Sequence, residues 1–401
     1  MLLSHHAYTN ALDNWGDTPL HKALRFRKFD VVNLLIRAGA SVNFRNKGNS
    51  TLLHEASESG NYDGVHLLLR HGADVNVLNH RGEAPLHKAL RSRKFDVVEL
   101  LVQGDANVNT RDKYNDSTSL HEALECGNLA VAQLLLSRGA DVNAQNHRRD
   151  LPLHQALRSQ FFDIVGPLLT AGADVNARDR DNSTPLHEAL KNRNVDIAQL
   201  LFGHGADVNA RNQRRDTPLH QALRSQRFHV VEPLLRAGAD VNTRDRDNST
   251  PLHEASESGN TEIAQLLLSY GADVNALNRR RDSPSHKALR FRRLDVVDLL
   301  LRGGADVNSR NENNSTPLHE ASESGNPDIA QLLLSYGADI NALDNWGDTP
   351  LHKSLRFRRF DVVDLLLRGG ADVNSRNENS STPLHEASES ENLGIARLLL
   401  N

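Results

Sequence analysis

Hydrophobic and polar residues alternate in a fixed pattern that predicts two short helices followed by a polar loop. In the first occurrence, Leu20, Ala23 and Leu24 form a small apolar face at helical spacing, after a threonine and a proline suited to a helix start. The segment 29–39, FDVVNLLIRAG, carries a broader apolar face and ends at Gly39, a typical helix stop. Residues 40–50 are polar and rich in turn-forming types, so they are expected to project as a finger-like loop.

This pattern repeats along the whole chain. The histidine of a TPLH-like tetrapeptide recurs every 33 residues, with one interval of 34, at positions 21, 54, 87, 121, 154, 187, 220, 253, 286, 319, 352 and 385. A GADVN-like segment follows each of the first eleven histidines. A period of this length indicates a repeat architecture rather than two or three globular domains.

The period, TPLH and GADVN together resemble the ankyrin repeat family over essentially all 401 residues. The resemblance implies an all-α solenoid: a curved, right-handed superhelix of helix-turn-helix units with projecting β-turn or hairpin fingers. We expect one continuous array, with the tail of a preceding repeat in 1–12, eleven full repeats in 13–379 and a truncated repeat in 380–401. In this family, partners usually bind on the concave side, formed by finger tips and first helices.

Charge alternates with a period of two repeats. After the tetrapeptide histidine, odd repeats carry Lys or Gln and then Arg three residues later, whereas even repeats carry Glu. Because packed helices lie about 10 Å apart, neighbouring first helices are expected to bring opposite charges together. The predicted inter-repeat ion-pair ladder comprises Lys22, Glu55, Lys88, Glu122, Glu188, Glu254, Lys287, Glu320, Lys353 and Glu386.

The same alternation also suits a striped recognition surface for partners. Basic finger tips precede odd repeats, and Arg-x-Arg segments stand between the helices of several odd repeats, where the family usually has glycine. The nearby phenylalanines are either partner anchors or pack back onto the second helix. Candidate partner-binding residues are Trp15, Arg25, Phe26, Arg27, Arg91, Arg93, Arg148, Arg149, Arg214, Arg215, Arg280, Arg281, Arg290, Phe291, Trp346, Arg356 and Phe357.

Recent copying of a two-repeat unit, or deliberate design, provides another explanation for these recurrences. Residues 296–313 and 362–379 are identical, and ALDNWGDTPLHK occurs at both 11–22 and 342–353.

Composition narrows the functional classes. The formal net charge is −4, aromatic residues make up 4% and Cys126 is the only cysteine, so neither a disulfide framework nor bulk binding of polyanions is indicated. The chain has no apolar run long enough to span a bilayer, and residues 1–10 do not form a secretion signal. These features favour an intracellular, cytoplasmic protein without membrane insertion, and a monomer unless exposed ends self-associate.

No catalytic motif is present. HExxH, GxSxG and Gly-rich phosphate loops are absent, and histidines on successive helices are too far apart to share a metal ion. In the family, the tetrapeptide histidine instead bridges neighbouring turns. We therefore expect no enzyme activity, no cofactor, no metal and no small-molecule substrate. Nucleic acid is disfavoured as a partner because acidic rows interrupt the basic ones.

The resemblance also implies one modification. Asparagines in DVN segments of ankyrin repeats are a target class for asparaginyl hydroxylation, and the alternative is a turn-stabilising role. The matching residues are Asn76, Asn143, Asn176, Asn209, Asn242, Asn275, Asn308 and Asn374.

Three functions agree with these features. The first is a non-catalytic scaffold or adaptor that binds other proteins. The second is a mechanical spacer whose elasticity matters more than any contact, and the third is recognition of a charged polymer such as nucleic acid or a cytoskeletal filament.

Overall fold

The computed structural model describes residues 7–192, 194–389 and 393–400. By their contacts they divide into two compact units, Met1–Ala206 and Asp207–Asn401, which are described separately. The predicted tail in 1–12 and the predicted last repeat in 380–401 therefore lie partly outside the described residues.

Both units are helical. In unit 1 the elements are α1 (Pro19–Arg25), α2 (Phe29–Arg37), α3 (Leu52–Ser59), α4 (Tyr62–Arg70), α5 (Pro85–Arg91), α6 (Phe95–Gln103), α7 (Ser119–Cys126), α8 (Leu129–Ser137), α9 (Pro152–Arg158), η2 (Phe162–Ile164), α10 (Val165–Thr170), α11 (Pro185–Lys191) and α12 (Val195–Gly203). In unit 2 they are α13 (Pro218–Arg224), η3 (Phe228–Val230), α14 (Val231–Arg236), α15 (Pro251–Ser258), α16 (Thr261–Ser269), α17 (Pro284–Arg290), α18 (Leu294–Arg302), α19 (Pro317–Ser324), α20 (Pro327–Ser335), α21 (Pro350–Arg356), α22 (Phe360–Arg368), α23 (Pro383–Glu389) and α24 (Leu393–Leu400). The described residues contain one isolated antiparallel bridge, between Arg111 and Thr118.

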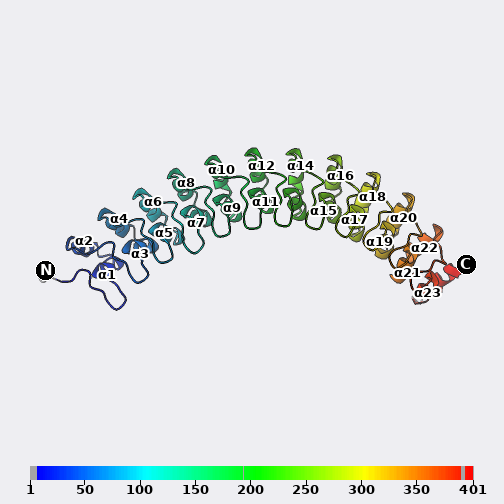
Figure 1. Cartoon of the computed structure of the whole chain (residues 1–401), viewed down its shortest axis with the longest axis horizontal. Helices are drawn as coiled ribbons and strands as arrows, with labels where there is room; N and C mark the ends of the chain where they lie inside the picture. The colour runs from blue at the N-terminus through cyan, green and yellow to red at the C-terminus, as the bar shows by residue number, and fades with distance from the viewer. Residues whose placement is uncertain (1–6, 193, 390–392, 401) are drawn as a thin grey trace. The chain divides into compact units, whose positions relative to one another are not determined.

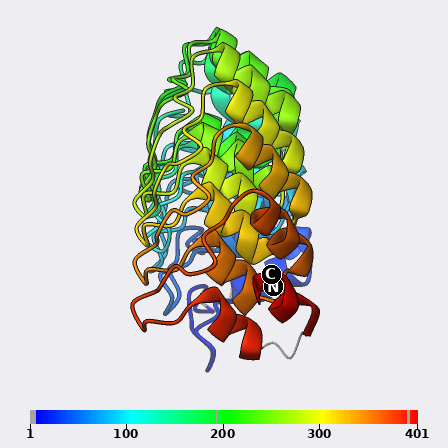
Figure 2. The same ribbon diagram turned by 90° about the vertical axis from the view of Figure 1, so that its right-hand side faces the viewer.

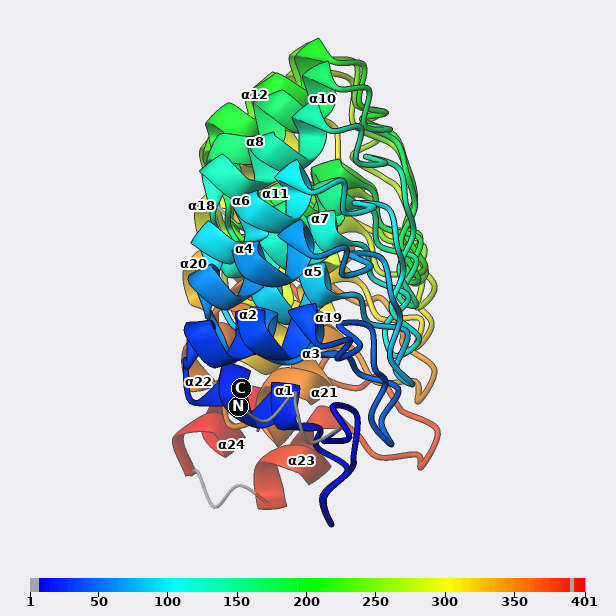
Figure 3. The ribbon, with the colours of Figure 1, turned by 90° about the vertical axis from the view of Figure 1, so that its left-hand side faces the viewer.

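Each unit has three layers. Successive helix pairs pack side by side, and the long loops leave them on one side (Figure 1). In unit 2 the first helices lie between the fingers and the second helices (Figure 2), and unit 1 repeats this order (Figure 3). None of the helices in the described part of the chain combines the length and the apolar character needed to cross a bilayer.

The sequence determines where the first helices begin. In α21, Thr349 precedes the helix in an extended conformation, and Pro350 occupies the first turn, where a missing N–H group is harmless. Leu351 and Leu355 are fully buried against the neighbouring layers. The small apolar face predicted from the tetrapeptide is therefore the inner face of this helix.

Two second helices begin with a 3₁₀ turn. Residues 162–164 and 228–230 form 3₁₀ turns that lead into the shorter helices α10 and α14. Pro167 and Pro233 lie in the first turn of these α-helices, where each removes a backbone donor. The helices shorten at their starts, and the apolar residues after each proline stay buried.

Each finger is a tight turn organised by an Asn or Asp side chain. In the finger of residues 278–282, the Asn278 side chain accepts hydrogen bonds from the backbone N–H groups of Arg280 and Asp282, both at 2.9 Å. Neighbouring fingers are joined by a backbone bond such as that from Glu312 N–H to the Arg280 carbonyl, at 2.8 Å. The finger tips therefore hold the same register from one repeat to the next.

Arginine occupies a left-handed position between the two helices of several odd repeats. Arg27, Arg93, Arg292 and Arg358 have φ values of 53–56°. Four of the six even repeats have glycine at the equivalent position, for example Gly127 with φ 70°, and the other two have Arg193 and Glu391 in the sequence. A side chain in this conformation costs about 1 kcal/mol or more, so these arginines are retained at the expense of stability.

Replacing Arg93 by glycine is expected to raise the free energy of unfolding by about 1 kcal/mol, because glycine adopts this conformation without strain. Urea unfolding followed by circular dichroism measures the change. Gly127→Ala is the matched control: a Cβ atom there would meet nothing within 4 Å, so the variant isolates the backbone cost and should lose about as much stability. Changes of the same sign in both variants would contradict this explanation.

Candidate functional site

The fingers and first helices form a hollow surface in unit 2. A cavity of about 350 Å³ opens between the fingers and α13, α15 and α17. Asp245, Asp247, Arg279, Arg280 and Lys287 are among the residues that line it. Its lining is almost wholly charged or polar, so it suits a charged or polar segment of a partner better than an apolar ligand.

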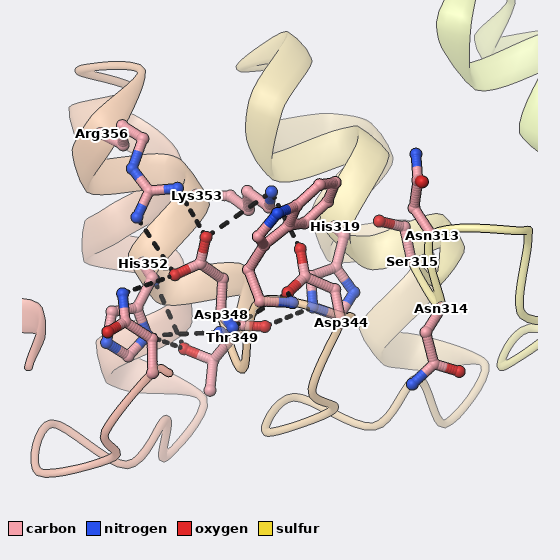
Figure 4. Close-up of polar contacts among 12 residues, drawn as sticks. Asn313, Asn314, Ser315, His319, Asp344, Asp348, Thr349, His352, Lys353 and Arg356 are labelled. Carbon is pink, nitrogen blue, oxygen red and sulfur yellow. Dashed lines mark hydrogen bonds and ion pairs between the residues drawn. The ribbon is translucent and has the colours of Figure 1, made fainter. Parts of the chain in front are cut away.

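An arginine at the end of each odd first helix is held between carboxylates. Arg356 of α21 bonds through Nη1 to Asp348 Oδ2 at 2.5 Å, and through Nη2 to Glu386 Oε1 of the next repeat at 2.9 Å (Figure 4 shows the former). Asp348 has no exposed side-chain surface. Burial alone would raise the pKa of Asp348, but hydrogen bonds from Arg356 and Asn377 lower this pKa below its ordinary value.

The same arrangement recurs in both units. The Arg–Glu pairs that join an odd repeat to the following even repeat are Arg25–Glu55, Arg91–Glu122, Arg158–Glu188, Arg224–Glu254, Arg290–Glu320 and Arg356–Glu386. Arg25, Arg91, Arg290 and Arg356 were predicted to bind partners. The structure instead engages each of them with carboxylates of its own chain, which leaves little of their charge for a partner.

The lysines of the predicted ladder do not pair with the ladder glutamates. Lys22 pairs with Asp13 at 2.9 Å and Lys353 with Asp344 at 2.9 Å, both in the finger of the same repeat. Lys88 and Lys287 pair backwards, with Glu58 and Glu257 of the preceding repeats. The prediction that these lysines pair with the glutamates of the ladder is thus wrong. The arginine three residues after each lysine pairs with those glutamates instead.

The buried acid beside each arginine was missed from the sequence. Asp17, Glu83, Asp150, Asp216, Asp282 and Asp348 each lie eight residues before the arginine that they pair with. The sequence contains a pattern that indicates this acid: the residue before the helix cap is acidic in every odd repeat and serine in every even one. Odd repeats therefore supply part of the negative charge that neutralises their own arginines.

Burial raises the pKa of Asp150 to about 6 despite its pair with Arg158.

Eleven of the twelve tetrapeptide histidines are buried and structural, whereas His385 is exposed. In α15, His253 Nδ1 accepts a hydrogen bond from the Thr250 N–H, and Nε2 donates to the Asp282 carbonyl of the next repeat at 2.9 Å. Burial lowers the pKa of His253 to about 4. The ring is therefore neutral at neutral pH and links two repeats through their backbones.

The family model described as ankyrin repeats, in three copies, matches residues 1–79, 53–146, 153–245, 210–278, 252–344 and 318–401. The chain belongs to the ankyrin repeat family. No curated protein matches it. The helical fold and the tandem repeats agree with the sequence prediction, and ankyrin repeats in general are non-catalytic modules of protein–protein interaction.

The tips of the ankyrin fingers carry the exposed arginines. Arg148 and Arg149 in unit 1, and Arg214, Arg215, Arg280 and Arg281 in unit 2, are exposed. The ion pairs of the described residues involve none of these six side chains. Together with Arg27 and Arg93, they are the predicted partner-binding arginines whose charge is available to a partner.

Two fingers present tryptophan instead. Trp15 and Trp346 are 78% and 49% exposed, and Lys22 and Lys353 lie over their rings at 4.9 and 4.7 Å from the centroid. Each lysine also pairs with an aspartate of the same finger, so the ring is held in a fixed position. A fixed, exposed tryptophan is a typical anchor at a protein interface.

The remaining candidates lie at the turn between the two helices. Phe26 is 67% exposed, whereas Phe291 and Phe357 are 41% and 40% exposed, so none of the three is buried against a second helix. Arg27, next to Phe26, and Arg93, next to Ser92 in another repeat, are also exposed.

The DVN asparagines join successive ankyrin repeats. Asn143, for example, donates through its amide to the Gly172 carbonyl at 3.0 Å and accepts from the Asp174 N–H at 2.8 Å. Asn76, Asn176, Asn209, Asn242, Asn275 and Asn308 also donate to a carbonyl 29 residues ahead, and Asn374 is exposed. This geometry accounts for the asparagines structurally, and their hydroxylation remains a prediction.

Proposed function

We propose that this chain is a non-catalytic scaffold that binds acidic segments of intracellular partner proteins with its fingers and first helices. The observation that carries the proposal is the set of exposed arginines at finger tips in 148–149, 214–215 and 280–281, beside first helices whose own arginines are already neutralised. Positive charge gathered at separate finger tips favours a partner whose negative charge is concentrated in short segments.

The strained arginines support the same proposal. Arg27, Arg93 and Arg358 keep a large charged side chain in a backbone conformation that suits glycine. Strain of this kind is commonly retained where a side chain serves binding rather than folding. Exposed phenylalanines stand next to two of them, at Phe26 and Phe357, and add apolar area at the edge of the surface.

Site-specific photo-crosslinking in cells tests this function. A photo-crosslinking amino acid is placed at Arg148, Arg214 or Arg280, or, as matched controls, at the exposed second-helix residues Gln133, Gln199 or Gln265. Partner proteins should be captured from the finger positions and not from the controls. Replacing residues 279–281 by glutamine should weaken binding of the captured partner about tenfold or more.

Two results would overturn the proposal. One is equal capture from fingers and second helices, and the other is a partner whose affinity does not change when the finger arginines are neutralised. Crosslinks to nucleic acid or to a filament instead of globular partners would favour the charged-polymer alternative, and no crosslink at any position would favour the spacer.

A further inference from the structure

Lys353 binds different acids from the equivalent lysine two repeats earlier. Lys287 reaches back to the preceding even repeat, where its Nζ atom lies 3.1 Å from Glu257 Oε2. Lys353 Nζ instead lies 2.9 Å from Asp344 Oδ2 and 3.6 Å from Asp348 Oδ2, both in its own repeat (Figure 4). The lysine at this position therefore has two alternative directions, towards the preceding first helix or towards its own finger.

One finger residue selects the direction. Where this residue is aspartate, at Asp13 and Asp344, the lysine nine residues later binds it. Where it is asparagine, at Asn79 and Asn278, the lysine pairs with a glutamate of the preceding repeat. Because a neutral amide does not attract an ammonium group as a carboxylate does, the finger aspartate is what draws Lys353 forward.

This change of direction leaves the carboxylate of Glu323, in α19, without an ion pair among the described residues. Glu323 is exposed and stands at the position of Glu257. Arg359 Nε donates to the backbone carbonyl of Glu323 at 2.9 Å, and Arg293 makes the same bond to Glu257. Since Glu257 binds Lys287 in addition, Glu323 has one cation fewer than its counterpart.

Trp346 forms an aromatic surface on the other side of Lys353. The Lys353 Nζ atom lies 4.7 Å from the centroid of the Trp346 ring, and the indole is about half exposed. Lys287 spans the equivalent distance to Glu257 with one side chain, so Glu323 also lies within a side-chain length of the Lys353 backbone. A cation brought by a partner can therefore contact the indole and the Glu323 carboxylate together.

The next finger adds a further negative charge. The Glu378 N–H group bonds to the Trp346 carbonyl at 2.9 Å, so the two fingers are direct neighbours. Glu378 is exposed, and its carboxylate forms no ion pair with any residue that the structure describes. The first tryptophan finger differs here, because Lys47 stands at the equivalent position beside Trp15.

Charge and shape together identify the group that this surface fits. Unpaired carboxylates favour a cation, and of the two cationic side chains the planar guanidinium of arginine both stacks on an indole and pairs with a carboxylate. We propose that Trp346 and Glu323 bind an arginine side chain in a basic, extended segment of a partner protein. This site uses none of the exposed finger arginines and does not depend on the function proposed above.

Tryptophan fluorescence tests the site in the full chain. The chain has two tryptophans, so a Trp15→Phe variant reports on Trp346 alone. The probe is a peptide of four Gly-Ser-Arg units, in which successive arginines lie about 10 Å apart, as neighbouring repeats do. This peptide should change the Trp346 emission saturably, and a peptide of four Gly-Ser-Gln units should not. In a Trp346→Phe variant the emission of Trp15 should stay unchanged, because Lys47 repels the peptide.

Three substitutions in the Trp15→Phe background address the chemistry. Glu323→Gln should weaken peptide binding about fivefold, the effect of losing one exposed carboxylate contact. Glu257→Gln is the matched control and should leave the affinity unchanged, because that carboxylate already binds Lys287. Asp344→Asn keeps the side-chain oxygen that organises the finger but lets Lys353 turn back to Glu323, so it should also weaken binding.

Circular dichroism establishes that each variant is folded. A Trp346 emission that the arginine peptide leaves unchanged would disprove the proposal, and so would equal weakening by Glu323→Gln and Glu257→Gln. An emission that changes with protein concentration alone would also disprove it, because a second copy of the chain would then occupy the site.

Discussion

Replacing Asp348 by alanine is expected to lower the free energy of unfolding by about 3 kcal/mol. The Asp348 side chain is fully buried and receives Arg356, Lys353 and the Asn377 amide. Loss of the carboxylate leaves Lys353 and Arg356 beside a buried cavity. Lys353 then keeps only Asp344, and Arg356 keeps only Glu386. Urea unfolding measures the total effect, and native-state amide hydrogen exchange in α21 and α22 locates it.

Asp364→Ala serves as the control for that variant. Asp364 pairs with Arg368 on the outer side of α22, and both side chains are largely exposed, at 42% and 79%. Such a surface pair contributes less than about 1 kcal/mol. If the two substitutions cost the same, the buried acid does not hold the repeats together in the way described.

Acidification is expected to destabilise the chain through its buried histidines. Burial lowers the pKa values of His220 and His253 to about 4, below the ordinary value of 6.5. The unfolded chain therefore binds more protons between pH 6.5 and pH 4, so stability falls as the pH falls through this window. At pH 4 each of the two histidines is expected to have lost about 3 kcal/mol of its contribution at pH 7.

Two buried acids, Asp150 and Asp216, act in the opposite direction, so the comparison needs a variant. Burial raises the pKa of Asp150 to about 6, and its protonation stabilises the folded chain as the pH falls. Burial likewise raises the pKa of Asp216. His253→Gln removes one titrating ring and should make the loss between pH 7 and pH 4 smaller by about 3 kcal/mol than in the wild type. Parallel pH profiles for the two proteins would show that His253 is not protonated on unfolding.

The helices were predictable because their signals are local. Thr349, Pro350 and the leucines after them lie within one short segment, and the pattern recurs in each repeat. Ion-pair partners were less predictable, because Asp348 approaches Arg356 from the finger side of the helix. Long side chains also pair with the nearest carboxylate rather than with the residue at the same position of the next first helix. The position of Phe44 against His21 depends on how a loop of one repeat packs against the previous first helix, which no local pattern reports.

Arg356 and its counterparts are each bound by an acid of their own repeat and by a glutamate of the next repeat. This arrangement limits how the array can change its number of repeats. Loss or gain of 66 residues keeps every arginine next to a glutamate of the following repeat, so the new junction is as well neutralised as the old one. Loss of one even repeat would place two odd repeats together, with arginine facing lysine or glutamine in place of the neighbour's glutamate. The charge pattern therefore favours changes in pairs of repeats over changes in single repeats.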